Sequence, residues 1–185
     1  MALTLGWGAP LTIDDLEKVP DDGHRYEILD GMLLVTPAPN TSHQTCVLVL
    51  GSVLLAAAGP GYTVLPAPYD WVIGPGTSFQ PDIVVARTAD VGPLRLERTP
   101  LLVVEVLSPS TRLVDLNLKR AAYEAAGVPA YWLVDPVGPS LTVLRLDEGA
   151  RYIEEASVAG TDAHHASHPF PVTVVPAALL RGGSG

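Results

Sequence analysis

The sequence predicts an α/β fold in which a central mixed β-sheet is flanked by helices, with a hairpin near the N-terminus. Strand-like and helix-like segments follow one another in the order helix, strands, helix, strand, strands, which most simply gives a mixed sheet with helices packed on its faces. The 185 residues, 48% of them hydrophobic, are enough for one well-buried core. We therefore expect a single domain over residues 1–185, with 181–185 as a flexible tail.

The chain begins with a short helix and a hairpin. Thr12 is a typical helix N-cap and opens a helix to about Val19. Two strands follow at 26–29 and 32–35. The Asp-Gly pair between them readily supplies the two positive φ angles of a type I′ turn.

A long apolar helix comes next. Thr41 or Ser42 can cap it, and it ends at Gly59-Pro60. The membrane-like part of this segment, 46–59, is too short to span a bilayer, so we interpret it as a buried helix.

The remaining strands are short apolar runs bounded by proline, glycine or polar residues. A second helix is expected from about Arg112 to Ala126, because a glycine such as Gly127, followed closely by a proline such as Pro129, is typical of a helix C-terminus. The expected strands are 62–65, 69–73, 82–86, 101–106, 130–134, 141–146 and 151–156, with a polar connection at 87–100.

Charge and cysteine content narrow the function classes. The net charge of −9 argues against a protein that holds nucleic acid by phosphate neutralisation alone. Residues 87–120 nevertheless carry six cations against four acids, so a polyanion could be received there, particularly with divalent metal present. Cys46 is the only cysteine, and the N-terminus lacks the features of a signal peptide. We expect a cytoplasmic protein that does not enter a membrane.

A carboxylate inside an apolar strand is the first sign of chemistry. Burying an unpaired carboxylate costs several kcal/mol, so Glu105 must be paired, protonated, at the exposed end of its strand or on a metal. Asp82 opens the preceding apolar strand. If the two strands are antiparallel neighbours, both carboxylates reach one edge of the sheet, whereas a parallel pairing separates them by roughly 13–17 Å. Together with the main-chain carbonyl of Val106 they are hard oxygen ligands suited to Mg²⁺.

Lys119 adds a cation. With Leu116 and Tyr123 it follows the i, i+3, i+7 spacing of one helical face. The chain has nine arginines and two lysines, and only an ammonium can lose its proton when it is desolvated. Asp115, four residues earlier, allows a simpler interpretation, a surface ion pair worth about 0.2–0.5 kcal/mol. For Lys119 alone the two interpretations are equal.

The ordered set of motifs resembles the Uma-two family of "putative restriction endonucleases", a branch of the PD-(D/E)XK nuclease superfamily. The likeness covers roughly residues 12–147. The motifs are Arg25-Tyr-Glu27-Ile-Leu-Asp-Gly31, Ser42-His43-Gln44, Gln80-Pro-Asp82, Val103-Val-Glu105-Val-Leu-Ser-Pro-Ser-Thr111, Asp115 with Lys119, Tyr123, and Gly127-Val-Pro-Ala-Tyr-Trp-Leu-Val-Asp135-Pro136.

The resemblance implies a restriction-endonuclease-like fold and a Mg²⁺-dependent endonuclease, with Mn²⁺ as a substitute and DNA as the expected substrate. Asp82 and Glu105 would be the metal ligands and Lys119 the catalytic lysine. Glu27 is similar to the upstream glutamate that often completes such sites. The superfamily's usual lysine position is Leu107 here, so Lys119 must reach in from the helix. A homodimer is expected by analogy with enzymes that cut both strands of a duplex.

Two other function classes stay open. One is a nuclease-like fold that binds nucleic acid or a protein partner without turnover, which the acidic net charge favours. The other is a hydrolase of a small phosphodiester, which we rank last because no glycine-rich phosphate loop follows a strand.

Several residues have simpler interpretations. Glu27 is equally a site carboxylate or a solvated strand residue, and Gln80 is expected to satisfy loop backbone. His43 is expected to be a surface residue near a helix cap. We assign Tyr131 and Trp132 to the core, and His164, His165 and His168 to a solvated loop.

Overall fold

The computed structural model describes residues 9–180. The 181–185 segment, expected to be a flexible tail, lies outside this range, as do residues 1–8. The strands are β1 (Arg25–Leu29), β2 (Met32–Thr36), β3 (Tyr62–Pro66), β4 (Asp70–Gly74), β5 (Thr77–Phe79), β6 (Ile83–Arg87), β7 (Arg95–Leu96), β8 (Leu102–Val106), β9 (Ala130–Asp135), β10 (Ser140–Leu146), β11 (Tyr152–Ala159), β12 (His164–Ala166) and β13 (Val172–Val174). The helical segments are α1 (Ile13–Leu16), α2 (Thr41–Ala57), η1 (Thr88–Asp90), η2 (Val114–Lys119), α3 (Arg120–Ala125) and η3 (Pro176–Leu180).

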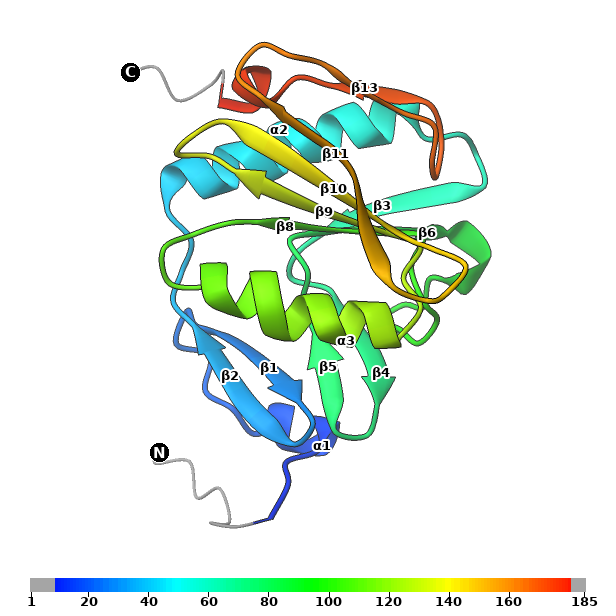
Figure 1. Ribbon diagram of the computed structural model, residues 1–185. Coiled ribbons are helices and arrows are strands. Elements are labelled where there is room, and N and C mark those ends of the chain that lie inside the picture. Colours follow the sequence, from blue (N-terminus) through cyan, green and yellow to red (C-terminus); the bar gives the residue numbers. More distant parts are fainter. Residues whose placement is uncertain (1–8, 181–185) are drawn as a thin grey trace.

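Two sheets form the frame of the molecule (Figure 1). The larger has the order β11-β10-β9-β8-β6-β3, and its neighbours are antiparallel except for the parallel pair β8 and β9. The smaller has the order β2-β1-β5-β4-β7. Helix α2 covers one face of the larger sheet, and the η2–α3 helix lies between its other face and the smaller sheet (Figure 1). The expected α/β class with a mixed sheet and an N-terminal hairpin is confirmed.

The turn between β1 and β2 has the predicted chemistry. Asp30 has φ 49° and Gly31 φ 78°, and the register pairs Leu29 with Met32. Both central residues therefore occupy the left-handed region that a type I′ turn requires. A Cβ at Gly31 would also lie 2.5 Å from the Cβ of Pro10, so glycine lets the N-terminal segment pack closely on the turn.

Strand pleating decides which face each residue of β8 reaches. Leu102 and Val104 belong to the core cluster under α2, whereas Val103 belongs to the cluster under α3. Because successive side chains alternate between faces, Glu105 points to the α3 side. The central apolar strand therefore delivers its one acid to the space between the two sheets.

Two local expectations were wrong, and two details of the fold were not foreseen. Asn40, and not Thr41 or Ser42, caps α2, because its side chain accepts a hydrogen bond from the His43 backbone N–H at 2.9 Å. Strands β5 and β7 were not predicted, because strands of three and two residues are too short to show a sequence period. The predicted second helix is present as η2 and α3, but its first part, η2, is a π-helix. His164 and His165 lie in β12, paired with β13, and not in a loop, whereas His168 lies outside the strands and is exposed.

Residues 9–180 contain no helix with the length and apolar character that a bilayer crossing requires.

We predict that Leu50→Ala lowers the free energy of unfolding by about 2–5 kcal/mol, because this fully buried α2 side chain packs on the larger sheet and its loss leaves a cavity. Leu48→Ala on the same helix is the control. Its side chain is 71% exposed, so we expect a change within about 0.5 kcal/mol. Urea unfolding of both variants measures the difference, and equal losses would contradict the packing assigned to α2.

Candidate active site

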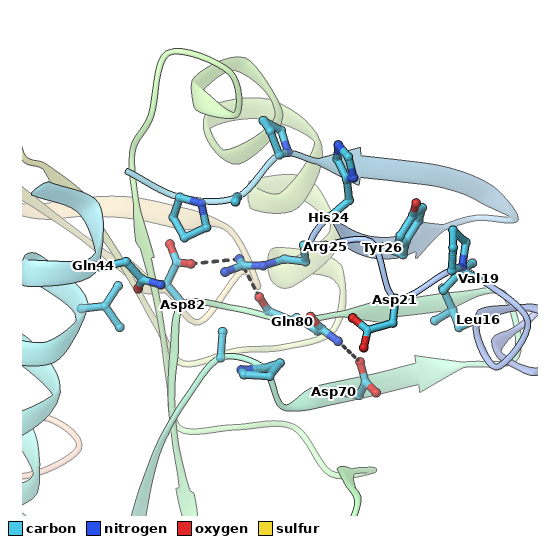
Figure 2. A pocket seen from close by; sticks show the side chains of 18 residues that line it. Leu16, Val19, Asp21, His24, Arg25, Tyr26, Gln44, Asp70, Gln80 and Asp82 are labelled. Atoms are coloured by element: carbon cyan, nitrogen blue, oxygen red, sulfur yellow. Dashed lines mark hydrogen bonds and ion pairs between the residues drawn. The ribbon is translucent and has the colours of Figure 1, made fainter. Parts of the chain in front are cut away.

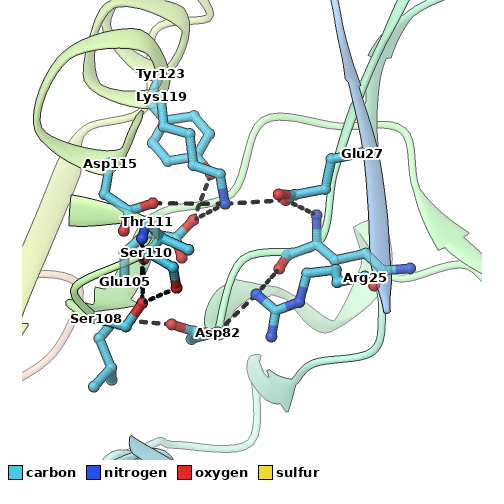
Figure 3. Close-up of polar contacts among 12 residues, drawn as sticks. Arg25, Glu27, Asp82, Glu105, Ser108, Ser110, Thr111, Asp115, Lys119 and Tyr123 are labelled. Carbon is cyan, nitrogen blue, oxygen red and sulfur yellow. Dashed lines mark hydrogen bonds and ion pairs between the residues drawn. The ribbon is translucent and has the colours of Figure 1, made fainter. Parts of the chain in front are cut away.

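Lys119 lies at the centre of a buried group of acids (Figure 3). Its Nζ is 3.0 Å from Glu27 Oε1, 3.0 Å from Glu105 Oε1 and 3.8 Å from Asp115 Oδ1. Lys119 is only 3% exposed. The structure therefore brings together three of the predicted site residues, Glu27, Glu105 and Lys119. The simpler interpretation of Asp115 and Lys119 as a surface ion pair is wrong, because both are buried.

The helix geometry keeps the site-facing residues on one side. In an α-helix, a step of four residues turns the chain about 40° more than a full turn. A π-helix has more than four residues per turn, so a step of four residues there gives less than a full turn. Asp115 to Lys119 spans η2, and Lys119 to Tyr123 enters α3. The two offsets oppose each other, so these three side chains stay aligned. The Tyr123 hydroxyl donates to Glu105 Oε1 at 2.7 Å, beside Lys119.

Asp82 occupies the same edge of the sheet with a different set of partners. The register of β6 and β8 pairs Ile83 with Val104, and continuing it by one residue places Asp82 opposite Glu105. The antiparallel pairing that we required is therefore present. Asp82 Oδ1 accepts from Arg25 at 2.9 Å (Figure 3). Its Oδ2 accepts from the Val106 backbone N–H at 2.8 Å.

His43 also contacts this carboxylate, which the sequence interpretation missed. Its Nε2 lies 3.0 Å from Asp82 Oδ2, and its side chain is buried, so the expectation of a surface residue near the cap was wrong. A signal was available. The buried residues of α2 are His43, Cys46, Val47, Leu50 and Leu54, and this i, i+3, i+4, i+7 spacing places His43 on the inward face.

Gln80 connects the parts of the site through its backbone. Its N–H donates to Glu27 Oε1 at 2.8 Å, and its carbonyl accepts from Arg25 at 3.0 Å. Its side chain donates to Asp70 Oδ1 at 2.9 Å. The expectation that Gln80 satisfies loop backbone was therefore wrong, since its own backbone holds two neighbouring charged residues and its side chain binds a third.

Burial and charge set the protonation of the acids. Burial raises the pKa of the Glu105 carboxyl to about 8, against the opposing attraction of Lys119, and raises that of Asp115 to about 6. Burial by itself would also raise the pKa of Asp82, but His43 and Arg25 outweigh it and lower that pKa to about 2. Burial would lower the pKa of Lys119, but Glu105 and Glu27 raise it above its ordinary value. Lys119 is therefore an ammonium at neutral pH, and without metal the Glu105 carboxyl is harder to ionise than an ordinary one.

A cavity of about 200 Å³ joins the two halves of the site, and Asp82, Glu105, Asp115 and Lys119 all line it. Among residues 9–180 no three His, Cys, Asp or Glu side chains are grouped closely enough to hold a metal by themselves. Mg²⁺, however, commonly takes one or two carboxylates and completes its shell with water and phosphate oxygens. The buried Asp115 Oδ1, which has no hydrogen-bond partner in the described part of the chain and lies 3.8 Å from Lys119 Nζ, is a further oxygen at this cavity. The donor set therefore fits Mg²⁺ in kind.

The α/β frame, with two acids at one sheet edge and a helical lysine beside them, agrees with a restriction-endonuclease-like fold. The sequence model of the Uma2 family, described as "Putative restriction endonuclease", matches residues 13–178. The chain therefore belongs to this family, and the match extends beyond the 12–147 region that carries the motif resemblance.

A solved structure supports the fold. A crystal structure described as a "putative nuclease belonging to DUF820" from Anabaena variabilis ATCC 29413 is similar with a TM-score of 0.69. The two chains share 20% identity, and the likeness covers 86% of this chain and 90% of that chain. No curated protein matches the chain.

We predict that the metal-free protein loses stability as pH rises from 5 to 9, and that Glu105→Gln reduces this loss. The Glu105 pKa is about 8 in the folded protein against a reference value of 4.5. Between these values the folded state binds more protons, so the free energy of unfolding falls as pH rises, on the order of 2–4 kcal/mol from this group. Glutamine imitates the protonated acid and removes that contribution.

Urea unfolding at pH 5, 7 and 9 with EDTA present measures the effect. Glu154→Gln on β11 is the matched control, because Glu154 is exposed. It is expected to keep the pH dependence of the parent protein. If the parent and Glu105→Gln curves run parallel, Glu105 does not hold a proton in the folded state.

Proposed function

We propose that this protein is a Mg²⁺-dependent endonuclease that hydrolyses phosphodiester bonds of nucleic acid, with DNA as the substrate. The observation that carries the proposal is the position of Lys119, 3.0 Å from both Glu27 and Glu105, in a cavity that Asp82 also lines. Carboxylates that can hold a metal, with an ammonium beside them, can supply the charge stabilisation that phosphodiester hydrolysis requires.

Asp82 and Glu105 are the proposed metal ligands, together with the Val106 carbonyl. Bound Mg²⁺, or Mn²⁺ in its place, supplies Lewis-acid stabilisation of the charge that develops on the phosphate. Arg25 and His43 hold Asp82 in place and keep it ionised. Tyr123 and Lys119 both bind Glu105 Oε1, so this carboxylate has a fixed direction.

Lys119 is the proposed catalytic amine. Its raised pKa keeps it charged, which supports a role in orienting the attacking water and stabilising negative charge over a role as proton acceptor. In the reaction the water oxygen bonds to phosphorus, the bond from phosphorus to the leaving oxygen breaks, and one proton of the water passes through solvent to the leaving oxygen. Glu27 is proposed to hold the ammonium from the side opposite Glu105 (Figure 3).

The wider setting follows from the family. We propose that the whole chain acts as one nuclease domain, that two copies form a homodimer so that both strands of a duplex can be cut, and that the protein works in the cytoplasm.

A second candidate function has an observation of its own. The carboxylates of the site already have cations beside them, Arg25 at Asp82 and Lys119 at Glu105. A module that binds nucleic acid or a protein without turnover could therefore keep this fold with no metal. Metal binding separates the two candidates.

Lys119→Met is predicted to lower the rate of Mg²⁺-dependent DNA cleavage by at least about 100-fold, because it removes the cation from the reacting phosphate. The other lysine of the chain offers a matched control. Lys18 is 68% exposed on its side chain and lies outside the site, so Lys18→Met should cleave at the parental rate. Circular dichroism checks that both variants fold. Cleavage by Lys119→Met within about threefold of the parent would exclude Lys119 as the catalytic lysine.

Asp82→Asn is predicted to weaken Mn²⁺ binding at least about tenfold, because an amide oxygen is a poorer ligand than a carboxylate. Titration calorimetry of the parent and variant measures this. Asp162→Asn, at an exposed position after β11, is the control and should bind as the parent does. A parent protein that binds neither Mn²⁺ nor Mg²⁺ would favour the inert module.

A further inference from the structure

A larger groove adjoins the active-site cavity. It has a volume of about 490 Å³, against about 200 Å³ for the cavity. Arg25, Asp82 and the 37–39 segment line both spaces, so the two compartments meet at the Arg25–Asp82 pair. Figure 2 shows Asp82 at one side of the groove and Asp70 at the other, with Arg25 and Gln80 between them. The volume lies within the usual range of small-molecule sites.

Part of the wall of this groove has no hydrogen-bond donors, although His24, Arg25, Tyr26, Gln44 and Gln80 also line it. Proline has no backbone N–H, so four of the wall residues cannot donate to a phosphate through the main chain. Leucine and valine side chains add apolar surface. The residues concerned are Pro20, Pro37, Pro39, Pro68, Leu16 and Val19.

The charges of the groove also disfavour a phosphate. Its basic side chains are already engaged, His24 with Asp22 and Arg25 with Asp82. Asp21 and Asp70 line the groove, and no salt bridge within residues 9–180 includes either of them. A sugar-phosphate backbone laid here would meet acids and apolar surface.

A nucleobase has the complementary properties. Its faces are apolar, and the exocyclic amino groups of adenine, cytosine and guanine are donors that a carboxylate accepts. Asp70 is held in position by the Gln80 side chain at 2.9 Å, and the Gln80 backbone binds Glu27 and Arg25. The carboxylate that would read the base is therefore connected to the site that would bind the phosphate.

We propose that the groove takes one unpaired nucleobase of the substrate, next to the phosphate in the active-site cavity, and that Asp70 binds its exocyclic amino group. The proposal rests on the proposed endonuclease function and specifies its substrate class. A base inside a duplex cannot enter the groove without leaving its stack. The preferred substrate is therefore a strand with an unpaired nucleotide, as a single strand or as a bulge, and not a continuous duplex.

The first test compares a DNA duplex carrying a one-nucleotide cytosine bulge with the same duplex without it. Binding to the parent protein is measured by fluorescence anisotropy in Ca²⁺, and cleavage by gel assay in Mg²⁺. Tighter binding of the bulged duplex, by about tenfold or more, supports the proposal. Equal binding of the two duplexes, or binding of neither, overturns it. Preferential binding without cleavage would leave the base groove standing and overturn the endonuclease function.

The second test examines Asp70. The parent should bind a bulged cytosine about tenfold more tightly than a bulged thymine, which carries a carbonyl where cytosine has its amino group. Asp70→Asn should reduce this ratio to about threefold or less, because an amide can donate to that carbonyl. Asp90→Asn in η1, away from the groove, is the control and should keep the parental ratio. An unchanged ratio in Asp70→Asn overturns the assignment of Asp70.

Discussion

One buried ammonium among carboxylates is the constraint on which the site depends. Lys119 is 3% exposed, and water cannot stabilise its charge at that depth. The acids that do so come from separate parts of the fold, Glu27 from the smaller sheet and Glu105 from the larger one. Removing either side chain would take away an oxygen that stabilises the buried ammonium, which is among the costlier changes a protein can undergo. Lys119 thus connects the two sheets beside the cavity.

The acids were predictable because they follow from strand rules alone. Asp82 and Glu105 stand at opposite ends of consecutive apolar strands, and antiparallel pairing with pleating brings them to one edge and one face. The buried position of His43 was also predictable from the periodicity of α2, but because it lies near the helix cap we expected it at the surface. The π-helix was not predictable, because the hydrogen bonds of a widened turn leave no sequence period of their own. Arg25 reaches Asp82 only through the tertiary arrangement of β1 beside the larger sheet.

The cations of residues 87–120 do not all lie free beside the site. Lys119 is buried, Arg112 is paired with Asp135, and Arg87 ends β6 at the side of the sheet away from Asp82. With a net charge of −9 and several acids in the cavity, the free protein has little long-range attraction for nucleic acid. A metal ion between the acids would reverse the local charge, so phosphate capture in the proposed mechanism depends on metal binding.

The Glu105 carboxylate is oriented by Tyr123, so no bound ligand is needed to orient it. Its ring packs against Trp71, Phe79 and Tyr131 at centroid distances of 5.5, 5.2 and 5.1 Å. Such an aromatic cluster leaves a ring few alternative positions. The hydroxyl at the end of that ring is the donor to Glu105, so the packing of the core determines where the carboxylate points. Groups held in place before the reaction need no reorganisation as charge develops, and this is the condition under which electrostatic stabilisation is most effective. Tyr123 therefore belongs to both the core and the site, through its ring and its hydroxyl respectively.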